Sequence, residues 1–298
     1  MKKKILVTGV NGMLGSAIAR ELKKQETAYE IQGIGQSESN EILLPSQYLK
    51  LDLLNFTELK QLLVDLDPDI IIHCAAQVNL DLCENDKEYA DKIHRDVTAV
   101  LASYKPFETR LIYISTDSVF DGTIGNYSED DKVNPLNYYA LSKFHGEEAV
   151  NKEQGNAVII RTNIYGFKKP GGKSLFEWIA TKLSNGESIT GFDDILFNPL
   201  YTGQLATLIA DMLRVDFSGV LHAGCSQFVS KYQFAVDIAK EFGWDTSLVQ
   251  QGNSDNIISK LARPKNTTLN TNKVKQIFGY VPDYKLGLKQ LFIDFHNK

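Results

Sequence analysis

The chain has 298 residues, of which 43% are hydrophobic and 23% are charged, an ordinary composition for a globular protein with a buried core. Its formal net charge of −5 gives no basic footprint for nucleic acid. No apolar run approaches the roughly 18 residues that span a bilayer, so no membrane partner is expected.

The N-terminal segment and the cysteines indicate a cytoplasmic protein. The lysines at positions 2–4 precede an apolar stretch that is too short for a signal peptide. Three cysteines lie far apart at positions 74, 83 and 225, and neither they nor the five histidines show the spacing of a metal site. We therefore expect reduced thiols and no bound metal.

Strand-like and helical patterns alternate through the first 165 residues. Short apolar runs predict buried strands at 5–7, 31–34, 49–53, 69–74, 110–115 and 157–161, and leucines recur at helical spacing over 14–22 and 59–66. Continuous apolar runs are typical of strands that are covered on both faces. The pattern predicts an α/β fold with a doubly wound parallel sheet of the Rossmann type.

This rhythm breaks after about residue 165. Gly and Pro interrupt the chain at 169–172 and 198–199, and helical patterns follow near 174–184, 203–214 and 230–242. We expect a larger domain formed by 1–165 with roughly 192–216. A smaller C-terminal α/β region would comprise 166–191 and 217–298.

Three glycines with the spacing G-x-x-G-x-x-G follow the first predicted strand. Such glycines permit a tight turn and let backbone N–H groups approach a pyrophosphate at a helix N-terminus. Glycines also occur in plain turns, but their place between the first strand and the first helix favours a dinucleotide site. The expected contacts in this turn are Gly9, Asn11, Gly12, Met13, Leu14 and Gly15.

The end of the second strand bears on which dinucleotide is bound. An acid is usual there, about 20 residues after the glycines, but this chain has Gly35, Gln36 and Ser37. Neither an acid that repels a 2′-phosphate nor an arginine that binds one is present, so NADPH is slightly favoured and NADH stays possible. Asp52, with Leu53 beside it, would accept a hydrogen bond from the adenine amino group, or would be an acid at a helix N-terminus.

A Tyr-x-x-x-Lys pattern supplies a candidate acid. Tyr139 and Lys143 share a helix face, so the ammonium would lower the pKa of the phenol toward the working pH. Tyr138 pairs with Ser142 instead and is the poorer candidate. Thr116, at the carboxyl end of the strand at 110–115, would bind the substrate oxygen or would be a turn hydroxyl. We predict that Thr116, Tyr139 and Lys143 form a catalytic trio for carbonyl reduction, and that Lys143 also binds the cofactor by holding the nicotinamide ribose.

Together these segments resemble the extended short-chain dehydrogenases/reductases over nearly the whole chain, and more closely their dTDP-4-dehydrorhamnose reductase branch. The resemblance implies that the first part binds NAD(P)H and the last part closes over a nucleotide-linked 4-keto-6-deoxy sugar. Such an enzyme would serve deoxysugar and cell-surface polysaccharide biosynthesis, and a homodimer is a fair expectation. The segments that carry the likeness are 8–15 (TGVNGMLG), 114–122 (ISTDSVFDG), 135–147 (PLNYYALSKFHGE), 161–166 (RTNIYG) and 262–269 (ARPKNTTL).

The resemblance also implies site residues beyond the trio. Ala75 and Ala76 would line the cofactor groove. Arg263 is chemically suited to a phosphate, although a surface salt bridge is the alternative. The residues expected to contact the substrate or support its site are Val119, Phe120, Asn163, Arg263 and Asn266.

Two departures from the family leave alternatives open. Ile93-His94 stands where the family has Val-Asn, and Asn163-Ile164 stands where close reductases have a bulkier pair. One alternative is an epimerase or dehydratase of nucleotide sugars with tightly held NAD, although Ser118 replaces the Glu that a dehydratase needs. Another is a dinucleotide-binding regulatory subunit like that of methionine adenosyltransferase, against which the intact Tyr139 and Lys143 argue.

Overall fold

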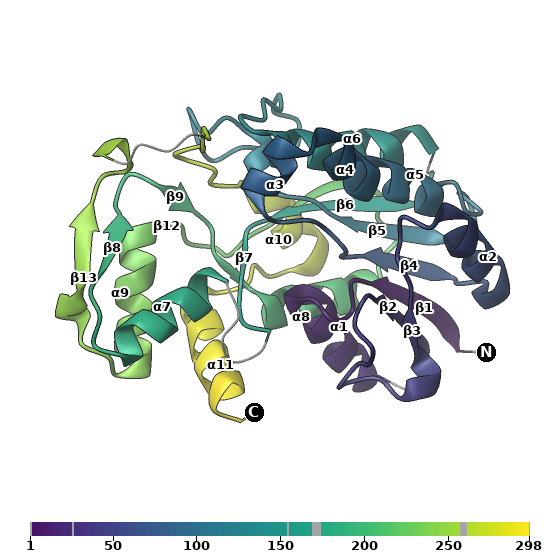
Figure 1. Cartoon of the computed structure of the whole chain (residues 1–298), viewed down its shortest axis with the longest axis horizontal. Helices are drawn as coiled ribbons and strands as arrows, with labels where there is room; N and C mark the ends of the chain where they lie inside the picture. The colour runs from purple at the N-terminus through teal and green to yellow at the C-terminus, as the bar shows by residue number, and fades with distance from the viewer. Residues whose placement is uncertain (1, 26, 154, 169–173, 257–260, 298) are drawn as a thin grey trace.

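A seven-stranded sheet dominates the computed structural model, which describes residues 2–25, 27–153, 155–168, 174–256 and 261–297 (Figure 1). Its strand order is β11-β6-β5-β4-β1-β2-β3, and every neighbouring pair is parallel. The predicted doubly wound sheet is therefore confirmed. The Gly- and Pro-rich break predicted at 169–172 lies outside the described residues.

The sheet consists of β1 (Lys3–Thr8), β2 (Tyr29–Gly35), β3 (Tyr48–Lys50), β4 (Ile70–His73), β5 (Arg110–Ile114), β6 (Ala157–Thr162) and β11 (Gly219–Ala223). Short two-stranded pairs join β7 (Ile164–Tyr165) to β10 (Leu200–Tyr201), β9 (Leu196–Phe197) to β12 (Val229–Ser230), and β8 (Ile189–Phe192) to β13 (Val249–Gly252). The α-helices are α1 (Met13–Lys23), α2 (Phe56–Leu66), α3 (Leu80–Asn85), α4 (Lys87–Asp91), α5 (Val97–Ala102), α6 (Tyr138–Glu153), α7 (Leu175–Ser184), α8 (Thr202–Met212), α9 (Lys231–Phe242), α10 (Asn272–Phe278) and α11 (Tyr284–His296). Single turns form η1 (Pro45–Gln47), η3 (Asp117–Val119), η4 (Thr246–Leu248) and η5 (Ser254–Asn256), and η2 (Lys92–Asp96) is π-helical.

Helices cover both faces of this sheet, which explains its continuous apolar strands. In β1, Ile5 and Val7 point into the core shared with α1, α8 and α10, whereas Leu6 points into the core shared with α2, α5 and α6. Successive side chains of a strand face opposite ways, so a strand buried on both sides is apolar at most positions. Among the described residues, no helix combines the length and the apolar character needed to cross a bilayer.

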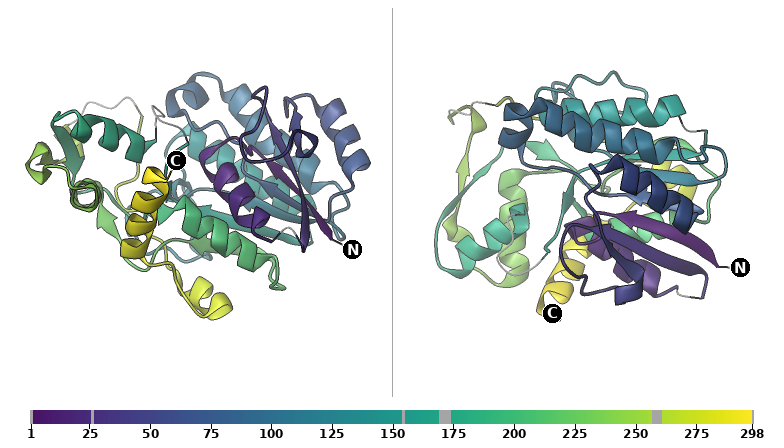
Figure 2. Two further views of the ribbon diagram at one scale, coloured as in Figure 1. Left: turned by 90° about the horizontal axis from the view of Figure 1, so that it is seen from below. Right: turned by 45° about the vertical axis from the view of Figure 1, so that its right-hand side comes forward.

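A second core, rich in aromatic residues, lies to one side of the sheet. It is built from α7, α9 and α11 around Phe176, Phe234 and Leu288, with Phe197 of β9 (Figure 2). The expected boundary at residue 217 is wrong for two elements. Strand β11 pairs with β6 inside the large sheet, and α10 packs on the first core through Val274, because their apolar side chains complete that core.

Three of the five histidines are buried, which generates a prediction about acid stability. Burial holds the pKa of His73 at about 3, that of His94 at about 2 and that of His222 at about 3. The unfolded chain binds protons at these groups below pH 6.5, whereas the folded chain does not. Stability is then full above pH 6.5 and falls by about 1.4 kcal/mol per pH unit for each histidine as the pH drops toward 3.

Chemical unfolding measured between pH 7 and pH 4 checks this expectation. His222→Asn keeps a donor for the Tyr127 carbonyl, which His222 Nδ1 contacts at 2.9 Å. The variant should show a shallower pH slope below pH 6.5, by about one proton. A free energy of unfolding that stays constant from pH 7 to pH 5 would show that these histidines are not held neutral.

Candidate functional site

The glycine turn between β1 and α1 is a close-packed backbone junction. Gly9 has φ +67°, and a Cβ there would lie 2.8 Å from the backbone of Ala75. A Cβ on Gly15 would lie 2.8 Å from the Cα atom of Val10, and the N–H of Gly12 donates to the Gly9 carbonyl at 2.8 Å. The turn therefore requires glycine at these positions, and it lies against the residues that follow β4.

The N-terminus of α1 suits a bound pyrophosphate. Gly12 precedes the helix and no side chain caps it, whereas Asn55, Ser174 and Ser230 cap α2, α7 and α9. The first N–H groups of α1 are thus left without a side-chain acceptor, and a helix N-terminus of this kind attracts anions. This fits a dinucleotide, which would contact the turn through its pyrophosphate.

Other predicted cofactor contacts lie around this turn with different exposures. Gln36 is exposed after β2, and Asn11 donates to the Ser39 carbonyl at 2.8 Å, which ties the turn to the loop beyond β2. Ala75 is half-buried beside Gly9, Ala76 is exposed, and Met13 is half-buried at the start of α1.

Leu14 and Leu53 differ from expectation. Both side chains are 5% exposed and packed in the two cores of the sheet, so only their backbone can face a ligand. Asp52 is exposed and accepts from the N–H of Leu54 at 3.1 Å, just before α2. Asp52 therefore acts as the acid before a helix N-terminus that the sequence also allowed, and its contact with adenine stays a prediction.

The glycine junction generates a second prediction. Gly15→Ala should destabilise the fold by about 1–3 kcal/mol through overpacking, and it should weaken NADPH binding because the turn must shift. Gly186→Ala is the control for NADPH binding, since no atom lies within 4 Å of its Cβ position, although its φ of +73° makes this substitution destabilising as well. Calorimetric titration with NADPH should show a loss only for Gly15→Ala, and equal affinities would contradict the assignment.

Helix α6 places Tyr139 and Lys143 against the carboxyl end of β5. Lys143 is buried, and its Nζ donates to the Ile114 carbonyl at 2.7 Å and lies 4.1 Å from the centroid of the Tyr113 ring. Tyr113 Oη in turn donates to the Lys143 carbonyl at 3.1 Å. These contacts fix the helix to the strand that ends at Thr116.

The expected lowering of the Tyr139 pKa is wrong for this arrangement. Burial raises the pKa of Tyr139 to about 12, although a hydrogen bond with Thr116 acts in the opposite direction. The reason is that the ammonium of Lys143 is turned toward the Ile114 carbonyl, and burial lowers its own pKa to about 7. Thr116 also accepts from the N–H of Ser118 at 3.2 Å, so it is a turn hydroxyl as well as a neighbour of the phenol.

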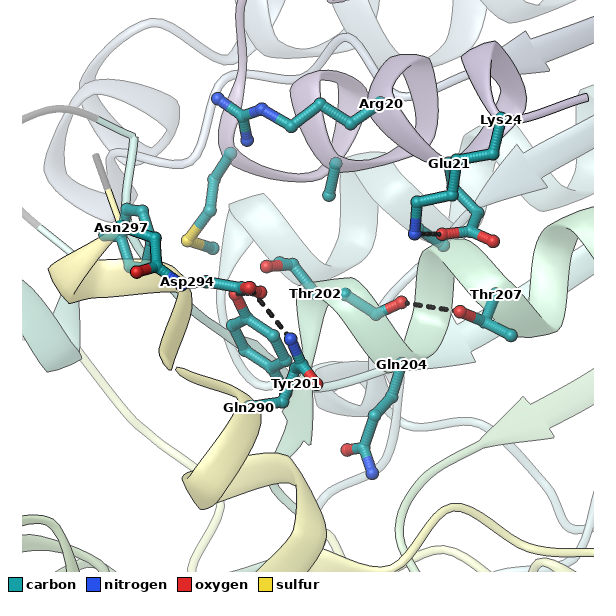
Figure 3. A pocket seen from close by; sticks show the side chains of 15 residues that line it. Arg20, Glu21, Lys24, Tyr201, Thr202, Gln204, Thr207, Gln290, Asp294 and Asn297 are labelled. Carbon is teal, nitrogen blue, oxygen red and sulfur yellow. Dashed lines mark hydrogen bonds and ion pairs between the residues drawn. The ribbon is translucent and has the colours of Figure 1, made fainter. Parts of the chain in front are cut away.

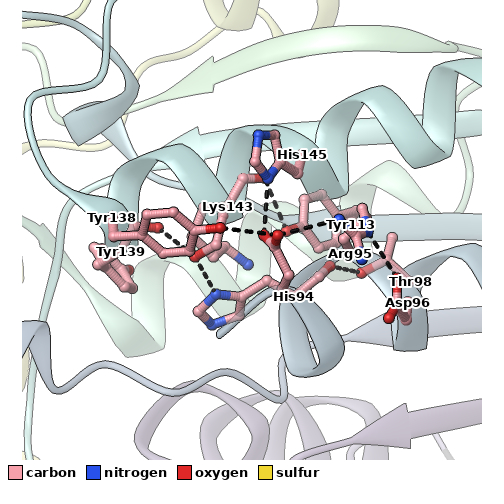
Figure 4. Close-up of polar contacts among 11 residues, drawn as sticks. His94, Arg95, Asp96, Thr98, Tyr113, Tyr138, Tyr139, Lys143 and His145 are labelled. Atoms are coloured by element: carbon pink, nitrogen blue, oxygen red, sulfur yellow. Dashed lines mark hydrogen bonds and ion pairs between the residues drawn. The ribbon is translucent and has the colours of Figure 1, made fainter. Parts of the chain in front are cut away.

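His94 of η2, which stands where the family has Asn, contacts helix α6 next to Tyr139 (Figure 4). Its Nε2 accepts from the N–H of Gln77 at 3.0 Å, and its Nδ1 lies 2.8 Å from Ser142 Oγ. Its ring stands edge-on to Tyr139, with centroids 5.8 Å apart. His94 therefore links the loop after β4 to α6, next to the candidate acid.

Tyr138 is occupied elsewhere. Its hydroxyl donates to Asp91 of α4 at 2.9 Å, and its backbone N–H donates to Glu84. Ser142, its neighbour one turn along, is already bonded to His94 and to the Tyr139 carbonyl. The two adjacent tyrosines thus have distinct surroundings, and only Tyr139 lies beside Thr116.

Asp117 joins three segments of the chain next to Thr116, a role that sequence reasoning missed. Its carboxylate is buried and accepts from Asn163 Nδ2 at 2.8 Å, from Thr267 Oγ1 and, more weakly, from Thr116 Oγ1 at 3.3 Å. Burial raises the pKa of Asp117. The segments S-T-D (115–117) and R-P-K-N-T-T-L (263–269) carried the sequence signal for this role, because the Asp117 carboxylate joins them through Thr267. The same carboxylate holds the predicted Asn163 near Thr116.

Val119 and Phe120 were wrongly expected to contact the substrate. Both side chains are fully buried in a small core with Tyr127 and Leu269, and the Phe120 ring stacks on Tyr127 with centroids 4.2 Å apart. They support the loop from beneath, because a run of apolar residues after a strand end packs inward.

The two residues predicted from the 262–269 segment differ in accessibility. Arg263 is exposed, as a ligand contact or a surface salt bridge requires. Asn266 is half-buried, accepts from the Thr268 hydroxyl at 2.8 Å and donates from its backbone to the Gly122 carbonyl. Asn266 thus supports the loops of the cleft.

A separate cavity of about 620 Å³ lies between α1, α8 and α11, lined by Arg20, Thr202 and Asp294 among others (Figure 3). Of the predicted site residues, only Met13 lines it. Its polar side chains are partly paired, as in the 2.7 Å bond from Tyr201 to Asp294. The cavity lies apart from the trio and does not enter the chemistry below.

The parallel sheet, the uncapped glycine turn and the Tyr–Lys helix define a dinucleotide-binding protein with the fold of the extended short-chain dehydrogenases/reductases. Comparison with known families agrees with this class. The chain belongs to the family described as RmlD substrate binding domain, which it matches over residues 2–297.

Individual proteins similar to this chain carry different descriptions. A probable low-salt glycan biosynthesis reductase, Agl14 of Haloferax volcanii, is 30% identical over 98% of this chain and 99% of that protein. Methionine adenosyltransferase 2 subunit beta of Xenopus tropicalis is 27% identical, over 97% of this chain and 86% of that protein. The crystal structure of dTDP-4-dehydrorhamnose reductase from Bacillus anthracis in complex with NADP superimposes with a TM-score of 0.86, at 27% identity, over 99% of this chain and all of that one.

Proposed function

We propose that this protein reduces the C4 keto group of a nucleotide-linked 4-keto-6-deoxy sugar with NADPH, and that NADH is an alternative donor. The observation that carries the proposal is the group of hydrogen-bonded side chains at the carboxyl ends of β5 and β6, where Tyr139 contacts Thr116 and where Thr116 and Asn163 both donate to Asp117. The N-terminus of α1, which no side chain caps, would bind the cofactor. Similarity to a reductase crystallised with NADP supports the choice of cofactor. The three cysteines are free thiols, in keeping with a cytoplasmic enzyme.

Each residue of the trio has a distinct part in the proposed reaction. The reduced nicotinamide supplies a hydride when it is bound. Thr116 orients the keto oxygen, and the Tyr139 hydroxyl gives its proton to that oxygen as negative charge develops. To stabilise the phenolate left behind, the ammonium of Lys143 must turn from the Ile114 carbonyl toward Tyr139 in the reacting complex.

A panel of nucleotide-linked 4-keto-6-deoxy sugars, assayed by NADPH oxidation with NADH in parallel, tests the function. Tyr139→Phe should lower kcat by about 10²–10⁴, the usual contribution of a general acid, and leave NADPH binding nearly unchanged. Tyr138→Phe is the matched control and should turn over normally, because its hydroxyl is bonded to Asp91. Near-normal turnover by Tyr139→Phe would remove the assignment.

Cofactor choice has its own test at the end of β2. Gln36→Asp would place a carboxylate where the 2′-phosphate of NADPH is expected, and charge repulsion should raise the KM for NADPH by about tenfold or more. The KM for NADH should change little, and Gln36→Asn serves as the uncharged control. Equal effects on both cofactors would show that Gln36 does not lie beside the 2′ position.

A second candidate function follows from the similarity to methionine adenosyltransferase 2 subunit beta. A chain of this kind would act as a dinucleotide-binding subunit of a synthetase. Co-purification with a methionine adenosyltransferase, together with no activity on any keto sugar, would favour it. Protein purified with bound NAD and without net NADPH oxidation would instead favour an epimerase or a dehydratase.

A further inference from the structure

Lys231 is a cation in the cleft that uses none of its side-chain donors. It begins α9 directly after the capping residue Ser230, and its backbone N–H donates to the Ile195 carbonyl at 3.0 Å. Its Nζ lies 3.3 Å from the centroid of the Phe197 ring. Within the part of the chain that the structure describes, this Nζ makes no hydrogen bond and no ion pair. The Lys231 side chain is half-buried, and its three N–H donors are free to bind a ligand that supplies acceptors.

The charges around Lys231 come from three segments of the chain. Burial lowers the pKa of Lys231 to about 8, Asp117 at the end of β5 acts against this, and Arg263 of the 262–269 segment lowers the pKa further. The oxygens of Asp117 already accept from Thr267, Asn163 and Thr116. Asp117 therefore compensates the charge of Lys231 without accepting a hydrogen bond from it, and the three N–H donors of Lys231 stay available.

We propose that Lys231 binds the sugar-side phosphate of the nucleotide-linked substrate, an inference that rests on the proposed function. In such a substrate the C4 ketone and the C1 diphosphate lie across the sugar ring from each other. Tyr139 and Thr116 are the proposed ketone contacts, and Thr267 joins Asp117 beside them to the 262–269 segment. That segment pairs with Leu196, next to the Ile195 carbonyl to which the N–H of Lys231 donates. These contacts bring the start of α9 to the segment that carries Arg263. A flexible ammonium suits one phosphate oxygen, and the guanidinium suits the outer phosphate.

Titration of the NADPH-saturated protein with dTDP and with UDP tests this assignment. Lys231→Met keeps the apolar stem on Phe197 but removes the charge, and it should weaken diphosphate binding by roughly tenfold or more, as expected for a lost charged hydrogen bond. Lys231→Arg should retain most of the affinity. Lys240→Met, at an exposed position on the same helix, is the control and should bind like the wild type.

A second readout does not depend on the folding of a variant. In the wild type, diphosphate affinity should fall as the pH rises above 8, because the ammonium loses its proton there while Arg263 stays charged. Lys231→Arg should remove this fall. With keto-sugar substrates, Lys231→Met should raise KM more than it lowers kcat. A lysine with only a structural role would show neither this preferential effect on KM nor the change in pH profile.

Several outcomes overturn the assignment. One is unchanged dTDP and UDP affinity in a folded Lys231→Met variant, and another is a wild type that binds neither diphosphate. A parallel loss of NADPH affinity in that variant would place Lys231 in the cofactor site and would also reject the proposal. If diphosphate binding depends on Lys231 but no keto sugar is reduced, this inference stands and the proposed reductase function is rejected. If keto sugars are reduced and Lys231→Met has no effect, the reductase function stands and this inference is rejected.

Discussion

The anchoring of α6 on the ends of β5 and β6 is the constraint on which the site depends. Lys143 and Glu147 lie one and two turns beyond Tyr139, and both are buried. Lys143 holds the Ile114 carbonyl, while Glu147 accepts from Ser115 Oγ and from a two-pronged contact with Arg161 of β6. Removing one partner of a buried ion pair leaves an uncompensated charge, so these contacts depend on one another. Together they hold α6 on the sheet and place the phenol of Tyr139 beside Thr116.

Hydrogen bonds to a buried carboxylate also join the two regions of the molecule. Asp117 receives donors from Asn163, which follows β6, and from Thr267, which belongs to the C-terminal region. A buried carboxylate is tolerated only when its oxygens are satisfied. The carboxylate therefore ties the C-terminal segment to the carboxyl end of β5. An apolar contact would also join the two regions, but it would not place a buried carboxylate next to Thr116.

Periodicity in the sequence was enough to predict six of the seven strands of the large sheet, because these strands are buried on both faces and form continuous apolar runs, whereas β11 was not predicted. The boundary near residue 217 was wrong because β11 and α10 return to the first core from a segment whose neighbours belong to the second. Within the site, Tyr139, Lys143 and Thr116 could be found from spacing on one helix and at one strand end. Asp117 and Lys231 could not be found in this way, since their importance arises from contacts across more than a hundred residues.

The raised pKa of Tyr139 explains in physical terms how one fold can serve either carbonyl reduction or dinucleotide binding alone. With Lys143 directed at a carbonyl oxygen and Tyr139 raised to a pKa of about 12, the phenol is a proton donor that does not ionise by itself. Proton transfer then requires a developing negative charge on a substrate oxygen held between Thr116 and Tyr139. A relative that kept the glycine turn but lost the contacts for such a substrate would still bind a dinucleotide and would catalyse nothing. Under the proposed function, the residues that separate the two roles would be Asp117, Asn163 and the C-terminal segment bonded to Asp117, and not the sheet.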